Sequence, residues 1–517
     1  MGHSSLSKPD SRSLKSEGQL FKPNYAQRHV EFAVSESDPI YADAFAYYHS
    51  GKTIHELYNL DKLLRSEEGL NNYHEGGFHC VYRGQLYQKR YMIVKKLGWG
   101  HFSTVWLAAD LQSFSYEMKP PCSHVAIKFQ RGQKQYLDSA LEEIKILQRI
   151  DTVSKSMNIP TVHLPVVKML GRFDVMGSGG KHICTIMEPL GGNLFDLIKN
   201  SPNKRVPMSS VKLIVRDALR GLDFLHRQCH VIHTDLKPEN ILTKSNEVMN
   251  ALAEGRYRKS DESMWSEDGF SFPSPVIKIA DLGNACHAFD RHSEYITTRQ
   301  YRAPEVLVRS FYGCAADIWS LGCIAFELLT GHYLFDPKPN ENARVSRDDD
   351  HVALIAEILG TATQNLIRSP LGQHYFLPDG RLRRIPELTQ WHLHEILVES
   401  YGFRHSDAME IAAFLIPMLH LDPSLRVSAR QHLKHPWLRP VMSEASKPAH
   451  DSFVVDFNPN HFSSKDSRST KLSDSFEGSL RQFKSSRPRS KTALPIETDW
   501  RYSSLRTRPH IPSHLDI

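Results

Sequence analysis

Three side chains in the stretch HTDLKPEN, residues 233 to 240, have types and spacing suited to chemistry on a phosphate. The carboxylate of Asp235 could accept the proton of a hydroxyl group, and the ammonium group of Lys237 could neutralise a phosphoryl group in transfer. The amide oxygen of Asn240 could hold a magnesium ion. The stretch therefore predicts a phosphoryl-transfer site, whereas a loop that is merely rich in Asp, Pro and Asn is the structural alternative.

A glycine-containing stretch, LGWGHFSTVWLA at residues 97 to 108, lies between two apolar runs with strand character. Gly98, Gly100 and Val105 fit the pattern G-x-G-x-x-G-x-V, in which Ser103 takes the third glycine position. Glycine lets a backbone close over nucleotide phosphates with its N–H groups facing them, and a small Ser does not block that approach. Taken alone the motif is weak, because glycines at a hairpin tip are more often simple turn residues.

A lysine and a glutamate follow in the order expected for an ion pair. Lys128 ends the strand-like run VAIK, and either Glu142 or Glu143 of the next segment could be its partner. That segment, residues 136 to 150, is predicted to be a helix from the spacing of Leu137, Leu141, Ile144 and Leu147. A lone lysine at a strand end and a helix-surface glutamate are normally solvated, so the order and spacing of the motifs carry this assignment.

Further motifs extend the series toward the C-terminus. Asp281 of IADLGNA follows a short apolar run and precedes Gly283, and its carboxylate could bridge a magnesium ion to phosphates. Beyond it, TTRQYRAPEVL ends in Ala-Pro-Glu at 303 to 305, and residues 316 to 331 are predicted to form a buried apolar helix. Glu305 is predicted to form a buried, structural ion pair with Arg426.

The order of these motifs along the chain resembles the eukaryotic protein kinases with high specificity. The resemblance implies an α+β, two-lobed fold, with a small β-rich lobe carrying one key helix, a hinge near IMEPLGG, and a larger helical lobe. It implies ATP and Mg²⁺ as cofactors, Asn240 and Asp281 as metal ligands, and Glu143 as the partner of Lys128, because that glutamate directly precedes an isoleucine. The implied ATP-binding residues are Leu97, Gly98, Gly100, Ser103, Val105, Ala126, Lys128, Met187, Glu188 and Leu190.

The sequence around the motifs is similar to that of the SR-protein kinase family over about Gly76 to Leu438. The similar stretches include GWGHFSTVW, HTDLKPENIL, DLGNAC and TRQYRAPEVL. That resemblance implies serines in Arg-Ser-rich, splicing-related proteins as substrates. It also implies an acidic docking groove, for which Asp348, Asp350 and Glu357 are the candidates. A charged helix start is the alternative explanation of these acids, since Asp favours helix N-termini. The long spacer of the better-known animal members is reduced here to a short insertion.

Thr234 stands where most kinases carry the Arg that binds a phosphorylated activation loop. A short hydroxyl cannot supply that charge, so we expect a kinase that is active without activation-loop phosphorylation. The loop would then be ordered by its own packing, with Phe289, Tyr295, Ile296 and Tyr301 as apolar anchors.

Three alternatives remain open from the sequence. SEYITTRQYRAPE resembles the dual-phosphorylation lip of the mitogen-activated kinases, with Ser293 and Tyr295 as acceptors. The LAMMER-type kinases also act on Arg-Ser proteins, but their signature is missing after Asp350. A catalytically inactive kinase-fold scaffold is disfavoured because Lys128, Asp235, Asn240 and Asp281 are all present.

The elements that hold these residues divide the chain of 517 residues into four parts. Residues 1–75 are predicted to be a largely disordered extension with a helix at 54–70, and 76–190 the small lobe and hinge. Residues 191–438 are predicted to be the large lobe, with a surface insertion at 246–275, and 439–517 a disordered tail rich in Ser and Arg.

Composition limits the remaining possibilities. A net charge of +6 is modest for this length and is no nucleic-acid signature, and no apolar run approaches the ~18 residues of a membrane span. The seven scattered cysteines argue against a disulfide framework or a zinc site. We therefore expect a monomer of the cytoplasm and nucleus that binds neither nucleic acid nor membranes, with the Arg-Ser-rich proteins implied by the resemblance as its partners.

Overall fold

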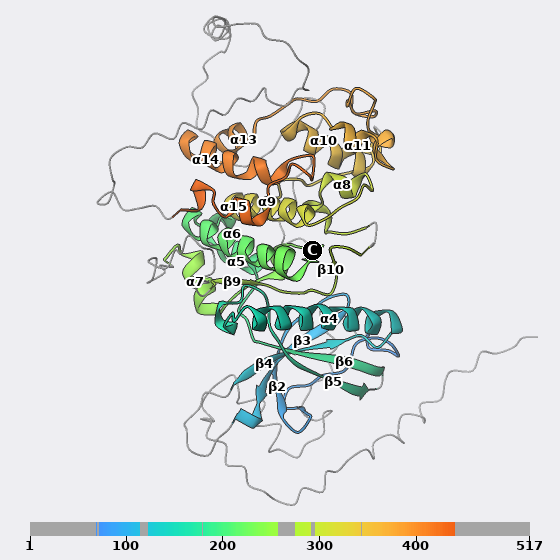
Figure 1. Ribbon diagram of the computed structural model, residues 1–517, viewed down its shortest axis with the longest axis vertical. Coiled ribbons are helices and arrows are strands. Elements are labelled where there is room, and N and C mark those ends of the chain that lie inside the picture. The colour runs from blue at the N-terminus through green and yellow to red at the C-terminus, as the bar shows by residue number, and fades with distance from the viewer. Residues whose placement is uncertain are drawn as a thin grey trace, which may run out of the picture. The chain divides into compact units, whose positions relative to one another are not determined.

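The computed structural model describes Gly69 and residues 72–439, apart from 114–122, 178, 257–274, 291–294 and 343 (Figure 1). The helix predicted at 54–70 and the tail predicted to be disordered lie outside the described residues, except for Gly69 and Arg439. The described chain forms two compact units. The first comprises the described residues up to Leu137 together with Gly171–Pro189, and the second comprises Asp138–Leu170 and the residues from Leu190 onward.

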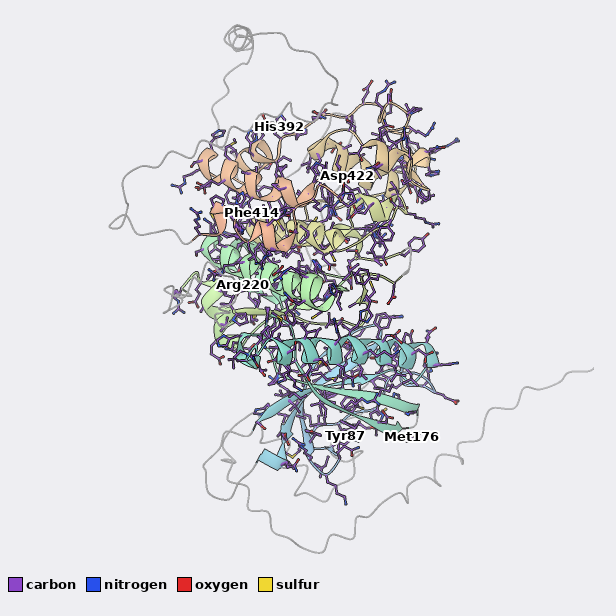
Figure 2. All side chains as sticks on the ribbon, viewed as in Figure 1. Tyr87, Met176, Arg220, His392, Phe414 and Asp422 are labelled. Carbon is purple, nitrogen blue, oxygen red and sulfur yellow. The ribbon has the colours of Figure 1, made fainter. Side chains whose placement is uncertain are left out.

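The first unit is built on a six-stranded sheet in the order β1-β2-β3-β4-β6-β5. The strands are β1 Leu86–Tyr87, β2 Tyr91–Trp99, β3 Ser103–Asp110, β4 His124–Gln130, β5 Met169–Gly177 and β6 Gly180–Met187. Successive side chains of a strand point to opposite faces, and one face of this sheet packs a core that includes Ile93, Ile127 and Phe129. Tyr87 belongs to this core, whereas Met176 is 74% exposed (Figure 2).

Helix α4, Lys134–Ser156, begins in the first unit, and most of it belongs to the second. The helix predicted at 136–150 is therefore confirmed, although the predicted small lobe assigned all of it to the first unit. Ala140, Ile144, Leu147 and Ile150 form its buried face at spacings of three and four. Leu141, which the sequence placed on that face, is exposed, because one residue beyond Ala140 turns about 100° around the helix.

The second unit is mainly helical. Its longer helices are α6 Met208–Asp223, α9 Ala315–Thr330, α10 Arg347–Leu359 and α14 His405–Leu415. The shorter ones are α5 Leu194–Asn200, α7 Asn246–Ala253, α8 Pro304–Leu307, α11 Gln364–Ile367, α12 Gly372–Tyr375, α13 Leu393–Glu399 and α15 Ala429–His432. Helix α9 is buried from Ala316 to Thr330, as predicted for 316 to 331. Among the described residues, no helix combines the length and apolar character needed to cross a bilayer.

Two short strand pairs in the second unit frame the predicted catalytic stretch. Strand β7, Val231–Ile232, pairs with β10, Cys286–His287, and β8, Ile241–Thr243, pairs with β9, Ile277–Ile279. Residues 233 to 240 therefore lie between two strands that are each fixed to the segment around Asp281. Of the predicted insertion, residues 246–253 form α7, which Ser245 caps by accepting a hydrogen bond from the Val248 N–H.

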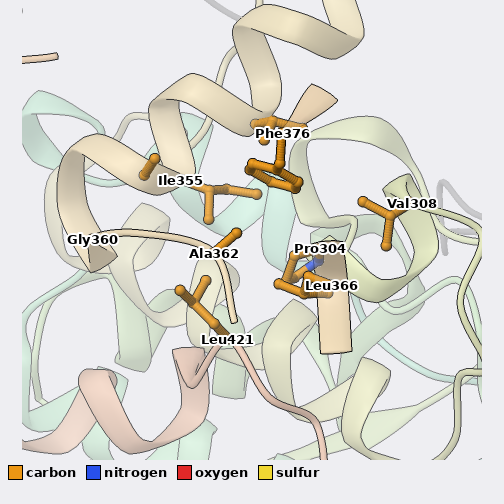
Figure 3. A pocket seen from close by; sticks show the side chains of 10 residues that line it. Pro304, Val308, Ile355, Gly360, Ala362, Leu366, Phe376 and Leu421 are labelled. Atoms are coloured by element: carbon orange, nitrogen blue, oxygen red, sulfur yellow. The ribbon is translucent and has the colours of Figure 1, made fainter. Parts of the chain in front are cut away.

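The predicted ion pair of Glu305 and Arg426 is confirmed. Nη1 and Nη2 of Arg426 donate to the two carboxylate oxygens of Glu305 at 2.8 and 2.9 Å, and both side chains are buried. A small pocket lies beside Glu305, lined by Pro304, Val308, Ile355, Leu366, Phe376, Leu421 and four further apolar residues (Figure 3). Because its lining offers no charged or polar side chain, this pocket is not suited to phosphoryl transfer.

Candidate active site

A buried aspartate of helix α9 holds the backbone of the catalytic stretch. Oδ2 of Asp317 accepts hydrogen bonds from the His233 N–H and from Nε2 of His226, each at 2.8 Å, and Oδ1 accepts from the Thr234 N–H at 3.0 Å. Burial alone would raise the pKa of Asp317, but the hydrogen bond and charge of His226 and the nearby His233 outweigh it and lower the pKa. The anchor is therefore an ionised carboxylate.

Asp235 is oriented from both of its oxygens. Oδ1 accepts hydrogen bonds from Oγ1 of Thr298 at 2.8 Å and from the Thr298 N–H at 3.1 Å, while Oδ2 accepts from Nζ of Lys237 at 2.9 Å. Burial would lower the pKa of Lys237, yet its attraction to Asp235, strengthened by their hydrogen bond, raises it. Lys237 thus stays charged beside the carboxylate, and the structure brings together two of the predicted catalytic residues.

The two predicted metal ligands are linked through the backbone of Ala280. The Ala280 N–H donates to the carbonyl oxygen of Asn240 at 2.9 Å, and Asp281 follows directly, with an exposed side chain. Nδ2 of Asn240 donates to the carbonyl oxygen of Asp235 at 2.8 Å, so the amide oxygen is the atom of Asn240 that can bind a cation. An amide and a carboxylate oxygen fit Mg²⁺, which proteins hold by one or two carboxylates together with substrate phosphates.

Thr234 makes a contact of a different kind from that of the missing arginine. Its φ of 65° is rare for a β-branched residue, and the side chain is 2% exposed. Oγ1 donates to the carbonyl oxygen of Asn284 at 2.7 Å, three residues beyond Asp281. The Thr234 hydroxyl therefore binds the start of the activation segment, residues 281–305, directly.

Arg302 holds the end of the activation segment together through hydrogen bonds within the segment. Its Nε donates to the carbonyl oxygens of Ile296 and Thr297 at 3.0 and 3.1 Å, and its Nη2 donates to that of Thr297 at 2.7 Å. Ile296 and Tyr301 are buried as predicted, and the Tyr301 hydroxyl donates to Glu327 at 2.7 Å. The prediction was wrong for two further anchors, because Phe289 is 83% and Tyr295 65% exposed. Hydrogen bonds from Arg302 to backbone carbonyl oxygens, and not these two rings, order this part of the segment. Ser293 lies outside the described residues.

The predicted ATP-binding residues of the first unit lie on adjoining strands. In the sheet register, Lys128 of β4 lies opposite Val105 of β3, and Ala126 lies opposite Met187 of β6. A methyl group added at Gly98 or Gly100 would meet no atom within 4 Å, and neither glycine has a positive φ. Local packing therefore does not require these glycines, and the Gly100 N–H donates to the carbonyl oxygen of Ser103 at 2.9 Å across the turn.

The other residues predicted for the nucleotide site are distributed as follows. Leu97 is 43% exposed, Ser103 is buried, and Glu188 and Leu190 are half-buried. Glu143 is buried on the part of α4 that belongs to the second unit, and its pairing with Lys128 stays a prediction.

The docking candidates lie on helix α10 with unequal exposure. Asp348 is the exposed one, with 42% of its side chain accessible, and it pairs with Arg299. Asp350 is buried and accepts a hydrogen bond from the Lys338 N–H at 2.9 Å, and Glu357 is 1% exposed. Asp349 completes a capping box with Ser346, so part of the acidic run does stabilise a helix start. The docking groove stays a prediction.

Sequence reasoning missed two positioning groups in this site. No motif pointed to Thr298 as a partner of Asp235, or to the pairing of His226 with Asp317. An available signal was Asp317, one of two acidic residues in a buried and largely apolar helix, because a buried carboxylate needs partners.

Known proteins show the same pattern. The protein kinase domain matches residues 91–438. The serine/threonine-protein kinase SRPK of Physarum polycephalum is 38% identical over 74% of this chain and 93% of its own length. Protein kinase dsk1 of Schizosaccharomyces pombe is 32% identical over 84% and 96%, and SRSF protein kinase 3 of Mus musculus is 31% identical over 72% and 91%. This chain therefore belongs to the protein kinases and, among them, to the SR-protein kinase family of serine/threonine kinases.

Proposed function

We propose that this kinase transfers the γ-phosphoryl group of ATP to serines of Arg-Ser-rich proteins, and that it does so without phosphorylation of its activation segment. The substrate class is supported by the similarity to relatives such as SRSF protein kinase 3. The observation that carries the chemistry is the orientation of Asp235 by Thr298 and Lys237.

Asp235 has one acceptor position to offer to a substrate. A carboxylate provides about four acceptor sites, and Thr298 and Lys237 occupy three of them through the hydrogen bonds described above. The remaining site can accept the hydrogen of a serine hydroxyl, so that the oxygen becomes a better nucleophile as the proton leaves. Lys237 can neutralise charge on the phosphoryl group in transfer. Mg²⁺ held by Asn240 and Asp281 would neutralise charge on the phosphates.

The proposal of phosphorylation-independent activity rests on how the activation segment is held. Thr234 binds the segment at the carbonyl oxygen of Asn284. Arg302, which is part of the segment, binds the carbonyl oxygens of Ile296 and Thr297 within it. These acceptors are present in every copy of the chain and need no modification. A phosphate would gain little from Thr234, because a neutral hydrogen bond is about half as strong as a charge-assisted one.

Two measurements on full-length protein made in bacteria test the proposal. Mass spectrometry first verifies that residues 281–305 carry no phosphate, and Mg-ATP turnover is then compared between an Arg-Ser peptide and a matched Ser-Pro peptide. We expect full turnover on the Arg-Ser peptide before and after treatment with an upstream kinase. A large activation through Ser293 or Tyr295, with preference for Ser-Pro, would favour the mitogen-activated type, and no phosphate transfer at all would favour the scaffold.

A further inference from the structure

A segment that precedes the matched kinase domain is part of the first unit. Residues 72–81, here called the N-terminal strap, lie before Tyr91, where the domain match begins. The Gly76 N–H donates to the carbonyl oxygen of Gly179 at 2.8 Å, and the Gly132 and Gln133 N–H groups donate to those of Gly77 and Gly76 at 3.0 and 2.9 Å. Gln133 directly precedes helix α4. The strap is therefore bound at the point where α4 begins.

The strap contains a tight internal turn that requires glycine. A methyl group added at Gly77 would lie 2.1 Å from the carbonyl oxygen of Asn72 and 3.0 Å from His74, both backbone contacts that cannot move aside easily. This turn gives the strap a defined shape. The side chain that follows, Phe78, is 2% exposed.

Arg131 connects the strap to the first turn of α4. Its guanidinium carbon lies 4.0 Å from the ring centroid of Phe78, and its Nη2 donates to Oδ1 of Asn72 at 2.7 Å. The same guanidinium carbon lies 5.7 Å from the ring centroid of Tyr136 in α4. An arginine near two aromatic rings gains cation–π attraction from each. Arg131 thus joins one ring of the strap to one ring of the helix.

Tyr136 in turn holds the tip of the glycine-rich loop. Its hydroxyl is hydrogen-bonded to Nε2 of His101 at 3.1 Å, and its ring lies 5.7 Å from those of His101 and Phe102, at interplanar angles of 79° and 68°. The Arg131 N–H also donates to the carbonyl oxygen of Phe102 at 2.9 Å. His101 and Phe102 are the two residues between Gly100 and Ser103, so the tip is attached to Arg131 and Tyr136 at several points.

We propose that Arg131 and Tyr136 are positioning residues for ATP, which hold the tip of the glycine-rich loop in place and are themselves held by the N-terminal strap. A loop with two glycines is costly to order when a ligand binds. Attaching its tip in advance lowers that cost and strengthens binding of the phosphates that the loop covers. The alternative is that the strap only stabilises the fold of the first unit and has no effect on ATP binding.

The sharpest test is Tyr136→Phe in the full-length protein, which removes one hydroxyl and keeps the ring. Calorimetric titration with Mg-ATP should show about two- to tenfold weaker binding, the range for one neutral hydrogen bond. Adenosine, which has no phosphates, should bind as it does to the wild type. His101→Ala should weaken ATP binding to a similar or larger extent, and adding Tyr136→Phe to it should have no further effect, because the two changes remove the same bond.

The strap itself is tested by Phe78→Ala and Phe78→Tyr, with Met176→Ala as a control at an exposed position of the same unit. Binding is measured at a temperature where circular dichroism shows each variant to be folded. Phe78→Ala should weaken the binding of ATP but not that of adenosine, and Phe78→Tyr should restore ATP binding. Unchanged ATP affinity in Tyr136→Phe and His101→Ala, or equal losses for ATP and adenosine, would overturn the proposed positioning role. A lower melting temperature of Phe78→Ala with wild-type ATP affinity would leave the strap a structural role only. Neither readout depends on the peptide substrate.

Discussion

Replacing Thr298 with Ala tests how much of the catalytic rate depends on the orientation of Asp235. The change removes the 2.8 Å hydrogen bond from Oγ1 of Thr298 to Oδ1 of Asp235 and leaves the bond from the Thr298 N–H in place. It also removes the longer contact of that hydroxyl with Nζ of Lys237, at 3.4 Å. The Asp235 carboxylate then keeps two of its three hydrogen bonds and gains freedom to rotate.

The size of the effect follows from the kind of bond that is lost. A hydrogen bond to a charged group contributes about 1.5–3 kcal/mol, and each 1.4 kcal/mol or so changes a rate about tenfold. If this energy is realised in the transition state, turnover of Thr298→Ala should fall roughly 10- to 100-fold. Thr298→Ser keeps the hydroxyl and should recover most of the rate.

The assay is turnover of an Arg-Ser peptide at saturating Mg-ATP. The affinity for ATP should be unchanged, because the hydroxyl acts on the base and not on the nucleotide. Thr297→Ala is the matched control, since Arg302 binds Thr297 through its backbone carbonyl oxygen, which alanine retains. A Thr298→Ala enzyme within about twofold of the wild type would refute the view that this hydroxyl orients the base.

Three further predictions concern the base, the activation segment and acid stability. Asp235→Asn should reduce turnover by ~10² or more while ATP binding stays nearly intact, as titration calorimetry would show. Arg302→Gln should lower turnover on the Arg-Ser peptide by about tenfold or more, because it removes hydrogen bonds to Ile296 and Thr297, and hydrogen exchange of residues 295–298 should accelerate. Burial, with a smaller contribution from His182 and His435 respectively, lowers the pKa of His79 and of His432 to about 4. The unfolded chain then binds more protons below pH ~6.5, so the melting temperature should fall as the pH drops from about 6.5 toward 4. Each histidine should lower the free energy of unfolding by about 3 kcal/mol over that range.

The sequence was most informative where the chemistry requires a particular residue at a fixed local spacing. Asp235, Lys237 and Asn240 lie within one loop, and the structure bonds each of them to another part of that loop. Helix α9 was likewise predictable, because burial on all sides leaves a continuous apolar run with few polar interruptions.

Contacts between distant segments were beyond a single sequence. Thr298 is 63 residues from Asp235, and His226 is 91 residues from Asp317, so no local pattern relates either pair. Exposure was also misjudged where a side chain has two possible roles. Phe289 and Tyr295 look like apolar anchors by type, but both are largely exposed and contact polar neighbours, His230 and Arg309 respectively. Arg302 instead binds the carbonyl oxygens next to Tyr295.

The way in which the activation segment is held bears on how such a kinase could be controlled. Thr234 attaches the start of the segment to the catalytic stretch, and Tyr301 attaches its end to Glu327 of α9. Arg302, itself part of the segment, holds that end together through Thr297. Releasing the segment would exchange these hydrogen bonds for bonds to water, at a net cost of about 0.5–1.5 kcal/mol each. The cation beside the exposed Tyr295 is Arg309, whose guanidinium carbon lies 4.7 Å from the ring centroid, whereas Arg302 is bound to two carbonyl oxygens and Thr234 carries no charge. None of the hydrogen bonds that hold the segment requires a modification, so on the proposed function control falls to the encounter of enzyme and substrate, through location or access.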